Sequence, residues 1–212
     1  MKTKKVLETI GWVFVFLFAI SGIILSVLQI PPNPNSYNEG FEQHPVQTLM
    51  HVIPGILFML LGPIQFMETI RKKYINFHRW CGRIFLVSCL FIVASAFYIV
   101  VTFPFEGLIE QLATLFFGGL FTYSLIMAYH HIRKKNISKH REFVIRVFSI
   151  GLGIVTIRIL IGVVQAMSNY QFREIFGWTF WGGFGFTWLI GEWWIWYSRS
   201  KKVLKKEVVV SN

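Results

Sequence analysis

Six long apolar segments constrain the fold of this 212-residue chain more than any other feature. They cover about residues 6–30, 47–70, 80–101, 109–131, 142–167 and 178–198. Each has roughly the 20 residues that an α-helix needs to cross the hydrocarbon core of a bilayer. No connection between them is long enough for a second domain. The sequence therefore predicts an all-α polytopic membrane protein, a six-transmembrane-helix bundle that forms a single integral-membrane domain over residues 1–212.

Basic residues lie at alternating ends of these segments. Nineteen of the 21 Lys and Arg residues fall into four clusters, at residues 2–5, 71–83, 133–146 and 199–206. Lys and Arg concentrate on the cytoplasmic side of membrane proteins. We therefore expect both termini to be cytoplasmic and the connections near Asn33, Phe105 and Tyr170 to lie outside.

The composition excludes a soluble nucleic-acid-binding protein. Hydrophobic residues make up 54% of the chain, its mean hydropathy is +0.55 and its net charge is +11. The positive charge is spread over the four cytoplasmic clusters, where it would meet the anionic headgroups of the inner leaflet. We expect a multi-pass protein of the bacterial cytoplasmic membrane, whose partner is the bilayer and not nucleic acid.

The first segment begins like a secretory signal, with basic residues followed by an apolar run. This run continues to Ile30 and no A-x-A cleavage site follows, so we expect a retained first helix. Cys81 and Cys89 lie in one segment and form no CxxC pair. We therefore expect no disulfide between them.

Polar and small residues of the second segment fall on one helical face. At 3.6 residues per turn this face contains His51, Gly55, Gly62, Gln65 and Thr69. Pro54 and Pro63 interrupt the same helix and release the carbonyl groups of Met50 and Met59. Neighbouring groups, water or a ligand must then satisfy these carbonyls, because lipid cannot. The alternative interpretation is an ordinary kinked helix with a packing groove.

The fifth segment carries two stripes. Gly151, Arg158, Gly162 and Gln165 form the first, and Arg146, Ser149 and Gly153 form the second. Arg158 lies ~12 Å from the outer end of its helix, which is too deep to reach the interface easily. A charge near the middle of the membrane costs about 2.5 to 3.5 kcal/mol on insertion scales. We therefore expect Arg158 to have a polar partner, such as a freed carbonyl group, or to face a water-filled cavity.

A second polar group lies at similar depth on the cytoplasmic side. It consists of Gln65, Arg83, Arg146 and Glu192. Glu192 is the only acid well inside the predicted spans, so its ionised form needs a cation, and either Arg83 or Arg146 could supply it. This group could be a structural ion-pair network or a proton or cofactor site. The GGFGF stretch at residues 182–186 predicts close approach of the last helix to a neighbour.

Two stretches of the sequence resemble a known family. They read PIQFMETIRKKYINFHRWCGRIF and KHREFVIRVFSIGLGIVTIRIL, and they are similar to predicted membrane proteins grouped as the domain of unknown function 2306 (DUF2306). The pattern of that family falls on His51, Gly62, Gln65, His78, Arg79, Gly82, Arg83, His140, Arg146 and Arg158. Phe143 and Val147 depart from the Trp and Ser expected there. The resemblance implies an architecture and a set of residues, but no reaction.

Three hypotheses for function fit these residues. In the first, the protein binds haem b or another redox cofactor. His78 and His140 would be the axial ligands of the haem, and Arg83 and Arg146 would bind its propionates. In the alternative interpretation, these His and Arg residues cap helix ends and contact lipid phosphate.

The second hypothesis is a protein that binds or transports a small molecule or a lipid headgroup. Arg158 with His51 would attract an anionic group, while Gln65, Arg146 and Glu192 would form an inner gate. In the third hypothesis the chain is a membrane subunit or scaffold, as a homo-oligomer or with an unknown partner. The chain contains none of the common motifs of soluble enzymes and no Asp. The sequence therefore assigns no reaction, and enzymatic activity stays an open question.

Overall fold

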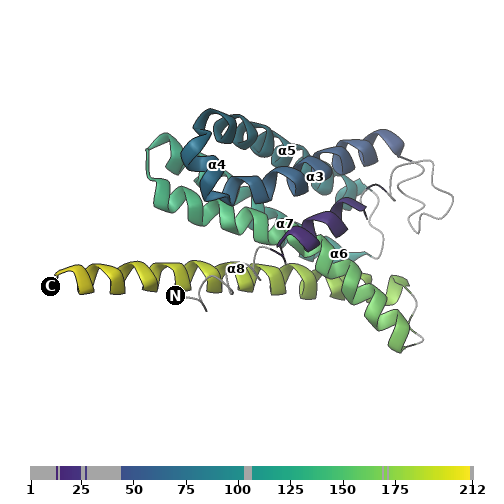
Figure 1. Ribbon diagram of the computed structural model, residues 1–212. Coiled ribbons are helices and arrows are strands. Elements are labelled where there is room, and N and C mark those ends of the chain that lie inside the picture. The colour runs from purple at the N-terminus through teal and green to yellow at the C-terminus, as the bar shows by residue number, and fades with distance from the viewer. Residues whose placement is uncertain are drawn as a thin grey trace. The chain divides into compact units, whose positions relative to one another are not determined.

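The described part of the chain is helical throughout. The computed structural model describes residues 13, 15–24, 27, 44–102, 107–168, 170 and 172–210, and only the backbone of residues 172, 173 and 201–210. The helices are α3 (Pro45–Phe66), α4 (Glu68–Lys73), α5 (Ile75–Thr102), α6 (Leu108–Arg133), α7 (Ile137–Met167) and α8 (Phe172–Val210), as Figure 1 shows. Within these residues there is no strand, which confirms the all-α prediction.

Four helices are long and apolar enough to cross a membrane, namely α3, α5, α6 and α7. A shorter apolar helix, Val15–Ile24, lies in the first predicted span, and the rest of that span falls mostly outside the described residues. The 39-residue helix α8 is long enough as well. Its middle part is less apolar, because it contains Glu192 and many Trp and Gly residues. The predicted external connection before residue 44 and the chain ends at residues 1–12 and 211–212 lie outside the described part.

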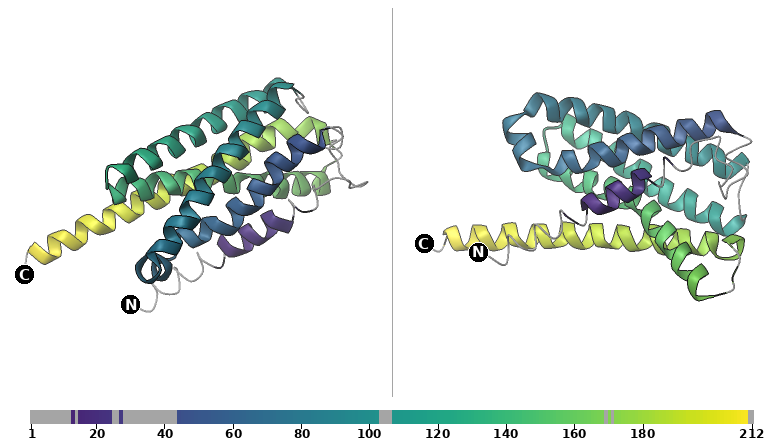
Figure 2. Two further views of the ribbon diagram at one scale, coloured as in Figure 1. Left: turned by 90° about the horizontal axis from the view of Figure 1, so that it is seen from above. Right: turned by 45° about the vertical axis from the view of Figure 1, so that its right-hand side comes forward.

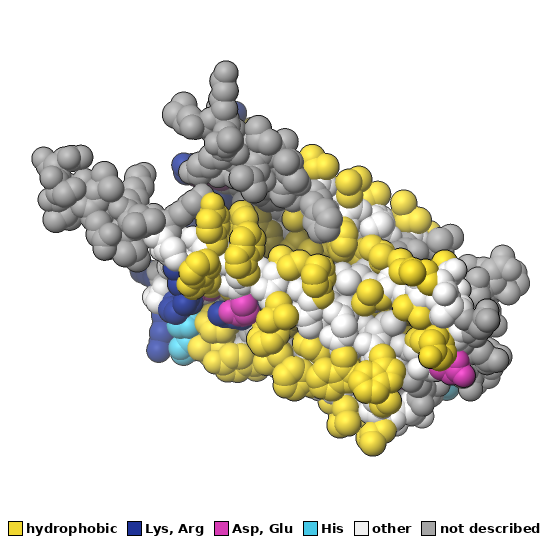
Figure 3. Space-filling model, turned by 90° about the horizontal axis from the view of Figure 1, so that it is seen from below, with side chains coloured by type: hydrophobic (Ala, Val, Ile, Leu, Met, Phe, Trp, Pro, Cys, Tyr) yellow, Lys and Arg dark blue, Asp and Glu magenta, His cyan; other side chains and the backbone are white. Residues whose placement is uncertain are grey.

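Large apolar side chains are exposed along the helices, as expected of a surface that faces lipid rather than water. Leu90, Ile126 and Leu189 are examples, with between 54% and 61% of each residue exposed. Figure 3 shows hydrophobic side chains spread across one face of the molecule. This distribution agrees with a membrane protein.

The helices extend beyond the predicted spans. α5 begins at Ile75, so His78 and Arg79 are helical, and α7 begins at Ile137. The Asn136 side chain caps α7 by accepting a hydrogen bond of 3.2 Å from the backbone N–H of Lys139. Hydropathy marks only the part of a helix that lies in lipid, whereas backbone hydrogen bonding continues into the polar region.

The second predicted span is not one continuous helix. α3 ends at Phe66, Met67 has an extended ψ of 113°, and α4 follows. The Met67 N–H bonds to the Ile64 carbonyl oxygen at 3.2 Å, which tightens the last turn just after Pro63. Thr69 therefore lies on α4 and does not continue the face of His51 and Gln65, contrary to the sequence-based expectation.

Two compact units divide the chain, residues 1–118 and residues 119–212. In the first unit α3 packs antiparallel along α5, as the views in Figure 2 show. The rings of Phe58 and Phe85 stack between the two helices with centroids 5.0 Å apart, and each residue is only 2% exposed. The prediction of a single integral-membrane domain stays a prediction.

In the second unit α7 packs antiparallel along α8. Glycines bring these two helices together. A Cβ atom at Gly183 would lie 2.9 Å from the backbone nitrogen of Ile157, and one at Gly191 would lie 2.8 Å from the Cβ of Ser149. The close approach expected from the GGFGF stretch is confirmed at Gly183, and Ser149 of the second predicted stripe faces α8.

Candidate functional site

An ion pair joins α7 and α8 at the polar position predicted from the sequence. The Nε of Arg146 donates to Oε1 of Glu192 at 2.5 Å, and its Nη2 donates to Oε2 at 2.9 Å. The two side chains are 19% and 33% exposed. A two-pronged pair of this kind fixes the orientation of both groups. Of the two cations that the sequence offered to Glu192, the structure selects Arg146.

The aromatic ring of Phe143 lies against the same guanidinium. The Arg146 Cζ is 4.8 Å from the ring centroid of Phe143, within the range of a cation–π contact. His131 at the end of α6 stacks on this ring, with centroids 5.5 Å apart. Arg146 is therefore bound in its plane by Glu192 and supported on its face by Phe143. The family pattern suggested Trp at position 143, and Phe keeps an aromatic face there.

A second ion pair, which the sequence analysis missed, lies nearer the end of the same two helices. Arg199 donates to both oxygens of Glu142, with Nε to Oε1 at 2.7 Å and Nη2 to Oε2 at 2.5 Å. Lys139 lies 3.3 Å from Oε2 of Glu142. The hydrogen bond from Glu142 raises the pKa of the Arg199 guanidinium, so Arg199 stays charged. Glu142 lies one turn before Arg146, a spacing that would have indicated a second pair once α8 was known to run antiparallel.

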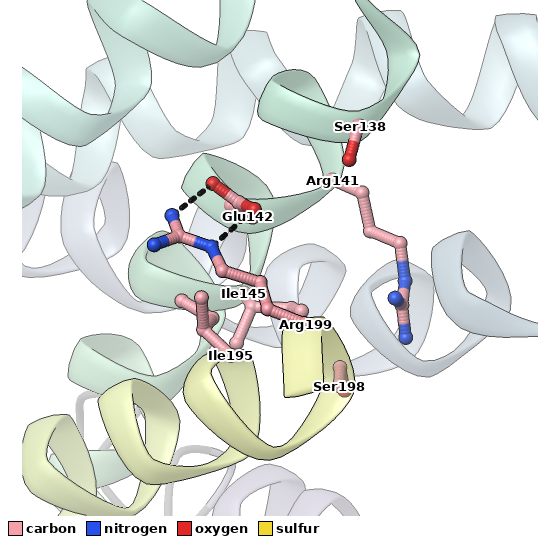
Figure 4. A pocket seen from close by; sticks show the side chains of 7 residues that line it. All are labelled: Ser138, Arg141, Glu142, Ile145, Ile195, Ser198 and Arg199. Atoms are coloured by element: carbon pink, nitrogen blue, oxygen red, sulfur yellow. Dashed lines mark hydrogen bonds and ion pairs between the residues drawn. The ribbon is translucent and has the colours of Figure 1, made fainter. Parts of the chain in front are cut away.

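A small pocket opens beside this second pair, between α7 and α8. It is lined by Ser138, Arg141, Glu142, Ile145, Ile195, Ser198 and Arg199 (Figure 4). Its cavity volume is about 20 Å³, which holds about one water molecule. In Figure 4 the Arg141 side chain extends away from Glu142 and takes no part in the pair with Arg199.

In the first unit, His51 of α3 contacts Ser95 of α5. The His51 Nδ1 and the Ser95 Oγ are 2.9 Å apart. The Ser95 hydroxyl donates to the Phe91 carbonyl oxygen at 2.6 Å, so it accepts from His51. This arrangement selects the tautomer of His51 with the proton on Nδ1. His51 is therefore oriented by the α3–α5 interface.

Gln65 lies at the other end of the same interface. A Cβ atom at Gly82 would lie 3.2 Å from the Gln65 Oε1, so the glycine makes room for this side chain. The Gln65 Nε2 is buried and has no hydrogen-bond partner among the described residues. A buried amide donor in this state requires water or a ligand.

The remaining candidates near the predicted cytoplasmic end lie in different surroundings. Arg79 and Arg83 are exposed, and the Arg83 Cζ lies 4.8 Å from the Trp80 ring centroid. His78 is partly buried. His140 of α7 donates from Nδ1 to the Ala128 carbonyl oxygen of α6 at 2.8 Å. His78 and His140 belong to different units, so their pairing stays a prediction, as does that of His51 with Arg158.

Arg158 is partly buried in the apolar length of α7. Its guanidinium makes no hydrogen bond or ion pair with any other described residue. Gly162, one turn further along the first predicted stripe, is exposed, and a Cβ atom there would meet nothing within 4 Å. The surface of α7 is therefore open at Gly162, one turn beyond Arg158.

The candidate residues meet only part of what a haem b site requires. Across the described part of the chain, no group of three or more His, Cys, Asp or Glu residues could hold a metal ion, but a haem needs only two axial ligands. His140 fits such a role, because its Nδ1–H donates to the Ala128 carbonyl oxygen and this tautomer leaves Nε2 unprotonated, as a metal ligand must be. Arg146 fits the role of a propionate ligand less well, because Glu192 balances its charge and accepts from its Nε and Nη2.

One protein family matches the part of the chain that contains these residues. The family described as "Predicted membrane protein (DUF2306)" matches residues 48–195 of the chain. This range includes every candidate from His51 to Glu192. No curated protein and no solved structure matches the chain.

Proposed function

The chain belongs to the DUF2306 family of predicted membrane proteins, and from this premise we propose that it crosses the cell membrane six times and binds an anionic group inside it. Four helices already have the length and apolarity of spans. The helix at Val15–Ile24 would be part of the first span and α8 the sixth. Two observations support α8 as a span: it packs along α7, and Trp178 and Trp196 are exposed near the two ends of its apolar part. The alternating basic clusters favour cytoplasmic termini.

The observation that supports an intramembrane site is the uncompensated charge of Arg158. It lies nine residues before the end of α7 at Met167, or roughly 14 Å along the helix axis. A guanidinium at this depth costs about 2.5 to 3.5 kcal/mol on insertion scales unless something compensates its charge. No described residue does so. An anionic ligand on the open side of α7 would supply the missing partner.

The ligand class follows from this environment. Apolar residues flank Arg158 along α7, including the exposed Ile159. A molecule that reaches the guanidinium from lipid should therefore carry one acidic group on an apolar body, as a fatty acid or another small lipophilic acid does. Arg146 and Glu192 bind each other, so they are less suited to ligand contact than Arg158.

This assignment is tested by adding oleate, or uncharged methyl oleate, to the chain of residues 1–212 in detergent. We expect oleate, but not methyl oleate, to raise the unfolding temperature measured by tryptophan fluorescence. Arg158→Leu should remove the oleate effect while raising the ligand-free unfolding temperature, because the buried charge is gone. Arg158→Lys should keep part of the effect.

The matched control is Arg133→Leu, which removes an exposed charge at the end of α6. This variant should respond to oleate as the natural chain does. If Arg158→Leu still responded fully to oleate, Arg158 would be a structural residue and the intramembrane site would be disproved.

A redox protein with haem b is the second candidate, and the hydrogen bond from His140 to Ala128 favours it. His140 would supply an axial ligand to the iron, and the bound haem would supply one-electron transfer. The absorption spectrum of the purified chain tests this candidate. A Soret band that is lost in His140→Ala but kept in His130→Ala, a change at an exposed neighbour, would support it. A chain that is expressed with haem supplied in excess and shows no Soret band after purification would contradict it.

A further inference from the structure

The pocket at the shared end of α7 and α8 combines hydroxyl groups, guanidinium groups and an apolar floor. Ser138 and Ser198 contribute hydroxyls, and Ile145 and Ile195 are only 7% and 2% exposed. The α7 residues that line the pocket, Ser138 to Ile145, lie 20 to 13 residues before Arg158, or roughly 30 to 20 Å along the helix axis. It is therefore separate from the proposed intramembrane site.

The charge around this pocket is positive in excess. Lys139 and Arg199 pair with the carboxylate of Glu142, and Arg141 lines the pocket as a third cation. Glu142 is 11% exposed and already bound by Arg199 and Lys139, so its negative charge is matched. Arg199 uses Nε and Nη2 for this pair and keeps further N–H donors on its guanidinium. Arg141 also lines the pocket, and its side chain extends away from Glu142 (Figure 4), so its guanidinium is a second cationic group beside the pocket.

The size of the cavity decides how an anion could enter. A volume of about 20 Å³ holds one water molecule and therefore one oxygen atom of a larger group. One oxygen of a tetrahedral anion would occupy the cavity near the serine hydroxyls. Its remaining oxygens would stay at the rim, where guanidinium groups bind such anions through paired N–H donors.

We propose that Ser138, Arg141, Ser198 and Arg199 form a binding site for a phosphate group, with Glu142 holding Arg199 in position. This end of α7 and α8 is the one that the charge pattern predicts to be cytoplasmic, at the depth of lipid headgroups. The phosphate could belong to an anionic lipid or be inorganic phosphate, because the recognising chemistry is the same.

The experiment titrates the full-length chain in neutral detergent with inorganic phosphate, dioctanoyl phosphatidic acid or dioctanoyl phosphatidylcholine. Tryptophan fluorescence reports binding through the unfolding temperature. We expect phosphatidic acid or inorganic phosphate to stabilise the natural chain, and Arg141→Ala to weaken that binding about tenfold. The double variant Ser138→Ala with Ser198→Ala should weaken it as well. Ser138 is exposed and Arg141 and Ser198 are only partly buried, so these changes should leave the ligand-free unfolding temperature near that of the natural chain.

Lys134→Ala is the matched control, because it removes an exposed cation at the same end of the bundle without touching the pocket. It should change the affinity less than twofold. Stabilisation by phosphatidic acid alone would identify a lipid headgroup, and stabilisation by inorganic phosphate would identify the free anion. The proposal fails if neither ligand binds, if phosphatidylcholine binds as well as phosphatidic acid, or if Lys134→Ala and Arg141→Ala weaken binding equally. Arg158→Leu should bind phosphate normally, so this site and the proposed intramembrane site can fail independently.

Discussion

The two arginines within the apolar length of α7 differ in whether a neighbouring group compensates their charge. Arg146 has Glu192 in its plane and Phe143 on its face, so its charge is compensated within the second unit. Arg158, twelve residues further along the helix, has no compensating group among the described residues. The same residue type is therefore structural at one depth and a candidate ligand-binding group at another.

Removing one partner of the Arg146–Glu192 pair should destabilise the second unit. Glu192→Gln leaves a partly buried guanidinium without its counter-charge, so we expect a loss of about 1 to 3 kcal/mol in the free energy of unfolding. Combining Glu192→Leu with Arg146→Met should recover most of this loss, because both charges are then absent. Denaturant unfolding in detergent measures each value.

Glu68→Gln serves as the control for this pair. Glu68 binds Lys72 on α4, and this contact lowers the pKa of Glu68, but both side chains are well exposed. Surface pairs of this kind contribute little to stability, so the unfolding midpoint should not change. Equal stability of Glu192→Gln and the natural chain would show that the Arg146–Glu192 pair is not structural.

At the scale of helices, glycines of α8 fix the register in which α8 packs against α7. Gly183 and Gly191 of α8 lie against Ile157 and Ser149 of α7, and the two ion pairs follow in the same antiparallel order. Close backbone approach of this kind drives helix association in lipid, where no hydrophobic force acts between helices. The glycines therefore position the guanidinium and carboxylate groups as well as the helices.

A larger side chain at Gly183 should separate the two helices. Gly183→Val would place methyl groups against the backbone of Ile157, and overpacking of this kind costs about 1 to 3 kcal/mol. Gly162→Val is the matched change, because the space beside Gly162 is open. The unfolding temperature of both variants, read by tryptophan fluorescence, should fall only for Gly183→Val. A similar fall for both would mean that helix propensity, and not contact with α7, explains the effect.

Across the whole molecule, the sequence predicted the interiors of the helices better than their ends. The apolar runs of α5, α6 and α7 were located correctly, because a bilayer demands about 20 apolar residues per span. The continuation of α5 back to Ile75 and the break at Met67 were not predicted. Both depend on local backbone hydrogen bonds, which hydropathy does not report.

The sequence predicted some residues of the candidate site and missed others. Glu192 stood out because an acid within a span is rare, and Gly82 and Gln65 of the family pattern do meet in the α3–α5 interface. Glu142 did not stand out, because it lies at a span boundary among basic residues. Its pairing with Arg199, 57 positions away in the sequence, depends on the register of α8 against α7, which the sequence does not give.

The sequence by itself determined that the helices lie in a lipid bilayer, that the fold is all-α and which family the chain belongs to. Each of these follows from patterns within single segments. Only the tertiary structure decided which cation binds Glu192, that Glu142 binds Arg199, and that Arg158 is left without a partner in the described chain. The physical reason is distance. A hydrogen bond forms only when two helices meet in a particular register, and that register depends on packing between surfaces far apart in the sequence.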